Sequence, residues 1–329
     1  MIRTAPETPR AEALPEAQTW LCNAGLPPVD IVALPGDVSP RRYARVHLED
    51  GGTAILATYP PDMRSSCERF LRATDLLAAA GVPVPRVLAA DCAAGLMLLE
   101  DLGLQTLADW KARPWSELGL YFERAACLGQ RIAGLQADPV AGLNPPLGAE
   151  LLRRELGQTW DLFLVPRGLT GGAALTAALS AALDELCARL GSGPPVPCHR
   201  DFMSRNLMPL DEQGGVAVLD HQDLRLGPAA YDLASLLNDT LFPPPEVEER
   251  LLAAATFTRD EYHRAAAQRT LKAVGTYISF ALRGAGRHLP LVAPTLARCL
   301  HHLARIPESE TLAGELSRVW QPALGPIAP

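Results

Sequence analysis

Residues 198 to 206 read Cys198-His199-Arg200-Asp201-Phe202-Met203-Ser204-Arg205-Asn206. An aspartate and an asparagine five positions apart allow one loop to present a base and a metal ligand to the same point. Phosphoryl transfer from ATP needs a carboxylate that orients the attacking hydroxyl and accepts its proton, and it needs oxygen ligands for Mg²⁺. The stretch therefore predicts that Asp201 is a catalytic base and that Asn206 is a magnesium ligand.

A second acidic residue follows at the place that this chemistry requires. Asp220 ends a short apolar run at 216–219, which predicts a strand returning in a hairpin to the loop. We interpret Asp220 as a second magnesium ligand on a rigid support. Residues 199–206 fit the HRDxxxxN pattern of kinase catalytic loops, and Asp220 stands where the metal-binding aspartate of the DFG motif stands. An isolated HxD is common by chance, so the combination carries the interpretation.

Four further residues belong to the candidate site. Gln222 and Asp223 follow Asp220 so closely that we expect them to face the cleft, either as substrate contacts or as loop caps. His199 is expected to be structural, with its ring bonded to backbone near the strand that ends at Asp220. Asp232 is expected to anchor the start of a helix by accepting hydrogen bonds from loop amides.

The hydrophobic periodicity changes near residue 101 and predicts two lobes. In the first part, the predicted elements are helices at 8–25 and 65–80 and strands at 42–48, 53–59, 86–90 and 96–100. After the change, the predicted elements are helices at 106–112, 116–136, 149–164 and 173–190, a hairpin at 206–210 and 216–220, and further helices from 229 onward. We predict an α+β, bilobal, protein-kinase-like fold. A nucleotide-binding lobe would span 1–101 and a helical, catalytic and substrate-binding lobe 102–329, with a cleft between them.

The composition is that of an ordinary soluble enzyme. The chain has 329 residues, of which 48% are hydrophobic and 20% charged, with a net charge of −7. The negative charge argues against binding to nucleic acid or to an anionic membrane. The first residues lack the apolar core of a signal peptide, and no stretch approaches the roughly 20 apolar residues of a membrane span. We therefore expect a cytoplasmic protein, and we expect it to be a monomer.

Seven cysteines are scattered along the chain without a CxxC or a His-paired spacing, so a zinc site has no support. An odd number of cysteines without a pattern predicts reduced, mostly buried thiols.

Residues 36–239 resemble the aminoglycoside phosphotransferase (choline/ethanolamine kinase-like) superfamily. The resemblance rests on Gly36-Asp37-Val38-Ser39-Pro40-Arg41-Arg42-Tyr43, the segments 80–87, 98–103 and 199–208, Leu219-Asp220-His221-Gln222-Asp223, and 269–275. Within that superfamily it is closest to kinases of cell-wall amino sugars. It implies phosphorylation of the anomeric (C1) hydroxyl of N-acetylmuramate and N-acetylglucosamine to sugar 1-phosphates, in peptidoglycan recycling.

The resemblance also implies where the ligands bind. ATP would lie between the lobes, with its adenine against the backbone from Glu100 to Leu102. The loop that contains Asp37, Ser39 and Arg42 would cover the phosphates. The same resemblance gives Asp201 as base, with Asn206 and Asp220 holding Mg²⁺.

The acceptor side is less fully specified. Arg205 suits contact with an acidic or acetamido sugar or with the transferred phosphate, because its guanidinium binds such groups bidentately. A surface salt bridge is the alternative for this residue. Arg269, Lys272 and Tyr277 are candidates for the sugar side, although a solvated helical face explains them almost as well.

One departure from the kinase pattern keeps other functions open. The predicted strand at 53–59 contains no lysine to pair the nucleotide phosphates. Arg41, Arg42 or Arg45 would have to supply that charge, and Glu68 lacks its usual partner. The alternatives are a kinase for another small alcohol, such as an aminoglycoside, choline or an amino alcohol, and a non-catalytic ATP-binding regulator. Low aromatic content argues against cationic substrates, and the intact base and metal ligands argue against the regulator.

Overall fold

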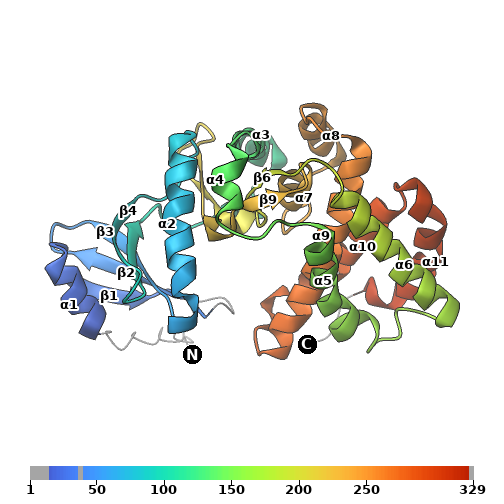
Figure 1. Cartoon of the computed structure of the whole chain (residues 1–329), viewed down its shortest axis with the longest axis horizontal. Coiled ribbons are helices and arrows are strands. Elements are labelled where there is room, and N and C mark those ends of the chain that lie inside the picture. The colour runs from blue at the N-terminus through green and yellow to red at the C-terminus, as the bar shows by residue number, and fades with distance from the viewer. Residues whose placement is uncertain (1–14, 36–39, 326–329) are drawn as a thin grey trace, which may run out of the picture.

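The computed structural model describes residues 15–35 and 40–325, which form two lobes (Figure 1). The smaller lobe is built on an antiparallel sheet with the strand order β1-β2-β3-β5-β4. Its strands are β1 (Pro28–Ala33), β2 (Arg42–Leu48), β3 (Thr53–Thr58), β4 (Val87–Asp91) and β5 (Leu96–Glu100). Because side chains alternate along each strand, the sheet has two faces that both need covering.

A helix covers each face of this sheet. Helix α1 (Pro15–Asn23) buries Leu21 in a cluster with Val46 and Leu56. Helix α2 (Arg64–Ala79) covers the opposite face, where Phe70 shares a cluster with Met97. The second face is the one turned toward the larger lobe, so strand residues on that side can reach a cleft.

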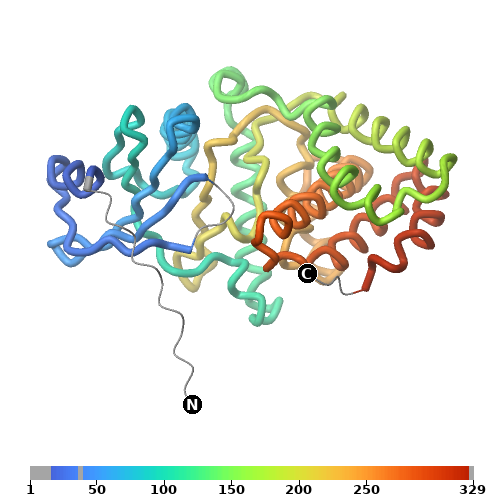
Figure 2. Tube along the Cα trace, turned by 90° about the horizontal axis from the view of Figure 1, so that it is seen from below, coloured from blue at the N-terminus to red at the C-terminus, as the bar shows by residue number. Residues whose placement is uncertain are grey.

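The larger lobe is mainly helical. Its helices are α3 (Trp115–Ala133), α4 (Ala137–Ala141), α5 (Ala149–Thr159), α6 (Ala173–Leu190), α7 (Tyr231–Leu237), α8 (Pro245–Ala253), α9 (Arg259–Leu282), α10 (Val292–Leu303) and α11 (Glu310–Trp320). Helix α9 is the centre of this lobe, because it packs against α5, α6, α7 and α10. Figures 1 and 2 both show α6, α10 and α11 at the end of the molecule opposite the sheet, and Figure 1 shows α3 and α4 near the middle.

Helices α5 and α9 approach each other closely at Gly275. A Cβ atom at this position would lie 2.4 Å from Thr159 Oγ1, and real Cβ contacts are never that short. The Gly275 N–H donates to the same hydroxyl over 3.1 Å, and Thr159 in turn donates to the Leu271 carbonyl over 2.6 Å. The missing side chain thus sets the spacing of two helices that lie behind the candidate site.

Two short ladders carry the candidate site residues between the lobes. Strand β6 (Val196–Cys198) pairs with β9 (Arg225–Gly227), and β7 (Leu207–Pro209) pairs with β8 (Val216–Val218). The stretch that contains Asp201 connects β6 to β7, and Asp220 follows β8. The fold therefore brings the predicted base and both predicted metal ligands to one place.

The predicted fold class is confirmed, and several element boundaries differ. The structure adds β1, which the sequence analysis missed because its burial does not alternate cleanly. The helix predicted at 106–112 is a 3₁₀ turn at Leu107–Trp110, and the one predicted at 149–164 changes into a π-helix at Trp160–Leu164. The helix predicted at 8–25 is observed as α1, and residues 8–14 of that prediction lie outside the described residues. Within the described ranges, no helix is long and apolar enough to cross a membrane.

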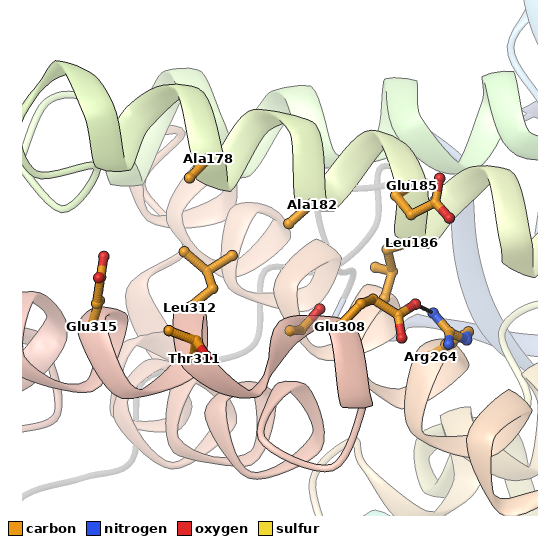
Figure 3. A pocket seen from close by; sticks show the side chains of 10 residues that line it. Ala178, Ala182, Glu185, Leu186, Arg264, Glu308, Thr311, Leu312 and Glu315 are labelled. Carbon is orange, nitrogen blue, oxygen red and sulfur yellow. Dashed lines mark hydrogen bonds and ion pairs between the residues drawn. The ribbon is translucent and has the colours of Figure 1, made fainter.

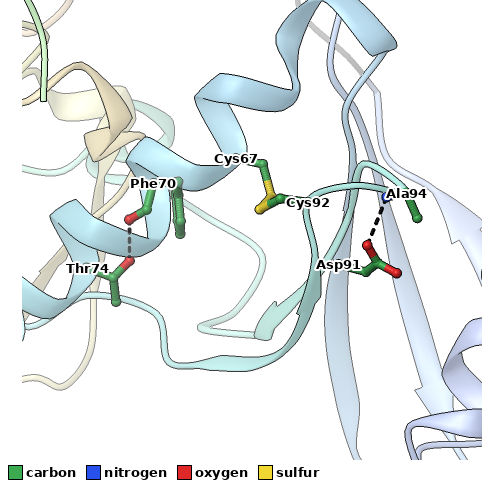
Figure 4. The surroundings of a disulfide bond; sticks show 6 residues. All are labelled: Cys67, Phe70, Thr74, Asp91, Cys92 and Ala94. Carbon is green, nitrogen blue, oxygen red and sulfur yellow. Dashed lines mark hydrogen bonds between the residues drawn. A yellow bond between two sulfur atoms is a disulfide. The ribbon is translucent and has the colours of Figure 1, made fainter.

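The prediction of reduced thiols is wrong for one pair. Cys67 on α2 and Cys92 after β4 form a disulfide, with their Cα atoms 5.6 Å apart (Figure 4). The sequence could not show this, because the two residues are 25 positions apart and meet only when α2 packs on the sheet. Cys187, Cys198 and Cys299 are buried thiols, as predicted.

Candidate active site

A cavity of about 570 Å³ lies between the two lobes. Strands β2, β3 and β5 and helix α2 supply its lining on one side, and residues near the ends of β7 and β8 supply it on the other. The backbone connection from Glu100 to Leu104 forms one edge. The predicted metal ligands Asn206 and Asp220 both line this cavity.

The loop that carries Asp201 has an uncommon backbone conformation. Arg200 has φ of 76°, in the left-handed region that side chains rarely adopt. The Asp232 carboxylate compensates for this, since it accepts hydrogen bonds from the backbone N–H groups of His199 (2.7 Å) and Arg200 (2.9 Å). The His199 ring places Nε2 2.8 Å from the Leu219 carbonyl oxygen. These contacts tie the loop to helix α7 and to the neighbouring hairpin.

Three cations surround the Asp201 carboxylate. Arg269 lies 3.3 Å and Lys272 3.8 Å from Oδ1, and Arg200 lies 3.9 Å from Oδ2. Burial alone would raise the pKa of Asp201, but the charges of Lys272, Arg200 and Arg269 outweigh it and hold that pKa well below its usual range. The carboxylate is therefore ionised at neutral pH, and 24% of the side chain is exposed. An ionised, partly exposed carboxylate is suited to orient a hydroxyl group.

The geometry around Asn206 and Asp220 fits a magnesium site. The Asn206 side-chain N–H donates to the Asp201 backbone carbonyl over 2.8 Å, so its own carbonyl oxygen is the atom suited to a metal. Asp220 has φ of 59° and directs Oδ1 toward Arg41 (2.8 Å) and Gln222 (3.1 Å). One amide oxygen and one carboxylate match the small number of protein ligands that Mg²⁺ takes when phosphates supply the rest.

Gln222 and Asp223 contact other site residues. Gln222 is buried and donates to Asp220, as just described. Asp223 forms ion pairs with Arg200 (3.1 Å) and Arg225 (2.9 Å). The structure thus places both side chains around the loop, and neither lines the cavity between the lobes. Their roles in substrate binding stay predictions.

Arg205 lines the cavity and is anchored from behind. It donates to Asp239 Oδ1 over 2.9 Å, and Tyr277 donates to the same oxygen over 3.4 Å. Asp239 is buried. Arg205 therefore forms a salt bridge with a buried carboxylate, rather than the surface salt bridge considered from the sequence, and its side chain remains 23% exposed.

The predicted nucleotide-binding residues are only partly described. Asp37 and Ser39 lie outside the described residues. Glu100 and Leu102 line the cavity, and the Glu100 side chain pairs with Arg86 at 3.2 Å. Arg42 is exposed and points to the sheet face on the side of α1, because side chains alternate along β2. It does not line the cavity.

Arg41 and Arg45, unlike Arg42, lie near the cleft. Arg41 reaches across the cavity to Asp220, and Arg45 binds Asp101 at 2.6 Å and the Gly103 carbonyl at 2.9 Å. The cleft face of β3, where a kinase lysine would stand, carries Ile55. Of the three arginines considered from the sequence, the geometry favours Arg41 as the charge nearest the metal ligands.

Glu155 is a site residue that the sequence did not predict. It lies on α5 with a side chain that is 9% exposed, and it accepts a hydrogen bond from Arg200 over 2.7 Å. It also lies 3.3 Å from Lys272. Nothing in its local sequence distinguishes it from the polar face of an ordinary helix, so only the fold reveals it. Glu68, for which no role was chosen, is exposed on α2.

Another cavity, of about 400 Å³, lies between α6 and α11 (Figure 3). Ala182 and Leu312 face each other across it, and Glu308 and Arg264 form an ion pair at one end. It contains none of the candidate site residues. The cavity between the lobes is therefore the one that the proposed chemistry concerns.

The chain belongs to the phosphotransferase enzyme family, because residues 30–267 match the model of that family. It is thus an ATP-dependent phosphotransferase that acts on a hydroxyl acceptor, as the sequence predicted.

Relatives with a curated name agree with this membership. The N-acetylmuramate/N-acetylglucosamine kinase of Pseudomonas aeruginosa is 37% identical over 247 residues, which cover 72% of this chain and 69% of the relative. The protein of the same name from Pseudomonas putida is 32% identical over 310 residues, with 88% of each chain covered.

Solved structures show the same fold at low sequence identity. The choline kinase LicA from Streptococcus pneumoniae has a TM-score of 0.62 at 14% identity, with 88% of this chain and 97% of that chain covered. The GDP complex of aminoglycoside 2′-phosphotransferase-IIIa has a TM-score of 0.61, also at 14% identity, with 92% and 97% covered. These likenesses confirm the kinase-like architecture.

Proposed function

We propose that this protein is a kinase of amino sugars, which transfers the γ-phosphoryl group of ATP to the anomeric hydroxyl of N-acetylmuramate and N-acetylglucosamine. The main support for this proposal is the similarity to N-acetylmuramate/N-acetylglucosamine kinases, which extends over 88% of the chain. The products would be sugar 1-phosphates in peptidoglycan recycling. We also propose that the protein acts as a monomer in the cytoplasm.

The electrostatics of the site support an uncharged or anionic acceptor over a cationic one. Arg200, Arg269 and Lys272 lie within 3.9 Å of the Asp201 carboxylate. A choline or aminoglycoside ammonium group brought to this carboxylate would meet three like charges at short range. A sugar hydroxyl carries no charge and can donate a hydrogen bond to the Asp201 carboxylate without meeting this repulsion.

We propose the following roles for the site residues. Asp201 accepts the proton of the acceptor hydroxyl. The segment from Glu100 to Leu102 borders the adenine. The nucleotide-binding lobe spans 1–101 and the catalytic lobe 102–329. The loop with Asp37 and Ser39 remains proposed to cover the phosphates, with Arg41 in place of Arg42 as the arginine on the cleft side. Asn206 and Asp220 would hold Mg²⁺, which when bound neutralises phosphate charge. Arg205, Gln222 and Asp223 remain proposed acceptor-side residues.

A substrate panel tests this proposal. The protein is incubated with MgATP and separately with N-acetylmuramate, N-acetylglucosamine, choline and kanamycin, and ADP release is followed. Phosphorus NMR then locates the new phosphate. We expect ADP with the two amino sugars and a phosphate on C1. Turnover with choline or kanamycin alone would overturn the sugar assignment, and ATP binding without any turnover would favour a regulator.

A further inference from the structure

Lys272 occupies a buried position directly behind the predicted base. It extends from α9, and its Nζ lies 3.3 Å from Glu155 Oε1 on α5 and 3.8 Å from Asp201 Oδ1. The Lys272 side chain is 11% exposed and that of Glu155 9%. Because its ammonium is covered by protein, Lys272 cannot be a direct contact for a substrate in this arrangement.

Both partners of this pair have unused hydrogen-bonding capacity. Within the described residues, the buried atoms Lys272 Nζ and Glu155 Oε2 have no hydrogen-bond partner. Charge-assisted N–H···O bonds are about 2.7–2.9 Å long, so the ammonium is held near two carboxylates without binding either tightly. Of the two carboxylates, that of Glu155 lies nearer to the ammonium, so its charge holds Lys272 in place behind Asp201.

The identity of the residue is also informative. The chain has 30 Lys and Arg residues, and only Lys111 and Lys272 are lysines. Lys111 is exposed. The other two cations beside Asp201 are arginines, which keep their charge at any accessible pH. Among these three cations, Lys272 alone can lose its proton.

We propose that Lys272 is a positioning residue for phosphoryl transfer: its ammonium, held in place by Glu155, fixes the orientation of the Asp201 carboxylate, and loss of its proton at alkaline pH slows the reaction. This inference rests on the proposed function, which makes Asp201 the base. Gly275 contributes indirectly, because its missing side chain lets α9 bring Lys272 close to Glu155 on α5.

The groups that surround Lys272 determine when it loses its charge. Burial lowers the pKa of Lys272 to about 8, although Asp201 and Glu155 attract its proton and Arg269 and Arg200 repel it. The ammonium is therefore charged below about pH 8 and becomes neutral above it. The kcat should accordingly be constant through neutral pH and fall on the alkaline side.

Kinetics on three variants test the role. The proteins are Lys272→Met, Lys272→Arg and, as a matched control at the exposed lysine, Lys111→Met, each measured from pH 6 to 10 with saturating MgATP and N-acetylglucosamine. We expect the kcat of Lys272→Met to be roughly tenfold to a hundredfold lower than that of the wild type, because a small misplacement of reacting groups has an effect of this size. Its KM for ATP should stay within about twofold of the wild-type value. Lys272→Arg should lose the alkaline decline, and the control should behave as wild type. A wild-type kcat and pH profile in Lys272→Met would overturn the proposal.

A second measurement does not depend on turnover. Protein labelled with ¹³C at lysine Cε should give two side-chain signals, which Lys111→Arg assigns. The Lys272 signal should titrate near pH 8 in the wild type and at lower pH in Asp201→Asn, because an attracting carboxylate is gone. An unchanged Lys272 titration in that variant would refute the coupling. Absence of amino-sugar turnover in the wild type would instead refute the proposed function, and the two failures are therefore distinguishable.

Discussion

At the scale of single residues, the site depends on two carboxylates with different tasks. Asp201 is partly exposed and lies among cations, whereas Asp232 is buried and binds only backbone N–H groups in the loop that carries Asp201. The HRDxxxxN spacing predicted Asp201, and Asp232 was predicted separately as a residue that anchors the start of a helix. The spacing was not sufficient to predict Glu155, because that residue reaches the site through the packing of α5 against α9.

Replacing Asp201 by asparagine should remove the base and leave the nucleotide contacts in place. We expect kcat to fall by about 10²–10⁴-fold, the usual contribution of a general base. The affinity for ATP, measured by calorimetry, should change little. A variant with near-normal kcat would show that Asp201 is not the base.

Replacing Asp232 by asparagine should destabilise the loop. The amide offers one acceptor oxygen, so one of the N–H groups of His199 and Arg200 loses its partner. We expect a loss of about 1–3 kcal/mol in the free energy of unfolding, measured with urea, because a buried donor is left unpaired. The kcat should also fall, since Arg200 would no longer be held at positive φ. Unchanged stability would mean that the loop holds its conformation without Asp232.

At the scale of secondary-structure elements, sequence patterns succeeded where glycines or turn residues mark the ends of an apolar or alternating run. Strands β2 and β5 and helix α6 have the predicted bounds. Sequence patterns failed where local and long-range forces compete, as in the π-helix that follows α5. The Cys67–Cys92 disulfide is the clearest case, because only tertiary packing brings its two residues together.

The close approach of α5 and α9 predicts opposite effects for two glycines. Gly275→Ala should destabilise the protein by about 1–3 kcal/mol, as overpacking of a core does. Gly157→Ala is the matched control, because a Cβ at that position of α5 would meet nothing within 4 Å. The control should be neutral or stabilise by up to about 1 kcal/mol through helix propensity. Thermal and urea unfolding check both, and equal effects would contradict the packing explanation.

The disulfide predicts a dependence on reducing agent. It closes a loop of 25 residues between α2 and the turn after β4. Reduction should lower the free energy of unfolding by about 3 kcal/mol on the chain-entropy estimate. Unfolding with and without dithiothreitol measures this, and a Cys67→Ala, Cys92→Ala double variant should lose the dependence. A wild type that is equally stable in both conditions would show that the bond contributes nothing.

At the scale of the whole molecule, an ion pair and a hydrogen bond between side chains connect the two lobes across the cleft. Arg41 of the smaller lobe holds Asp220 of the larger one at 2.8 Å. Thr74 on α2 and His221 form a second connection, with Oγ1 and Nε2 2.7 Å apart. The two-lobe plan was readable from the change in periodicity, whereas these connections were not, since each joins residues more than 140 positions apart.

MgCl₂ alone and MgATP should therefore differ in how much they stabilise the protein. We expect MgCl₂ alone to leave the melting temperature nearly unchanged, because Arg41 already occupies the Asp220 carboxylate. MgATP should raise it, by an amount that grows with the ratio of free ligand to Kd. Differential scanning fluorimetry compares the two, with Arg41→Met as the variant that should respond to MgCl₂ alone. A large shift with MgCl₂ in the wild type would contradict this expectation.

The ion pair between Arg41 and Asp220 also affects how a metal ion would reach the site. Because the Arg41 guanidinium already neutralises the Asp220 carboxylate, we expect free divalent ions to bind there weakly. We therefore expect Mg²⁺ to reach the site bound to ATP and not as the free ion.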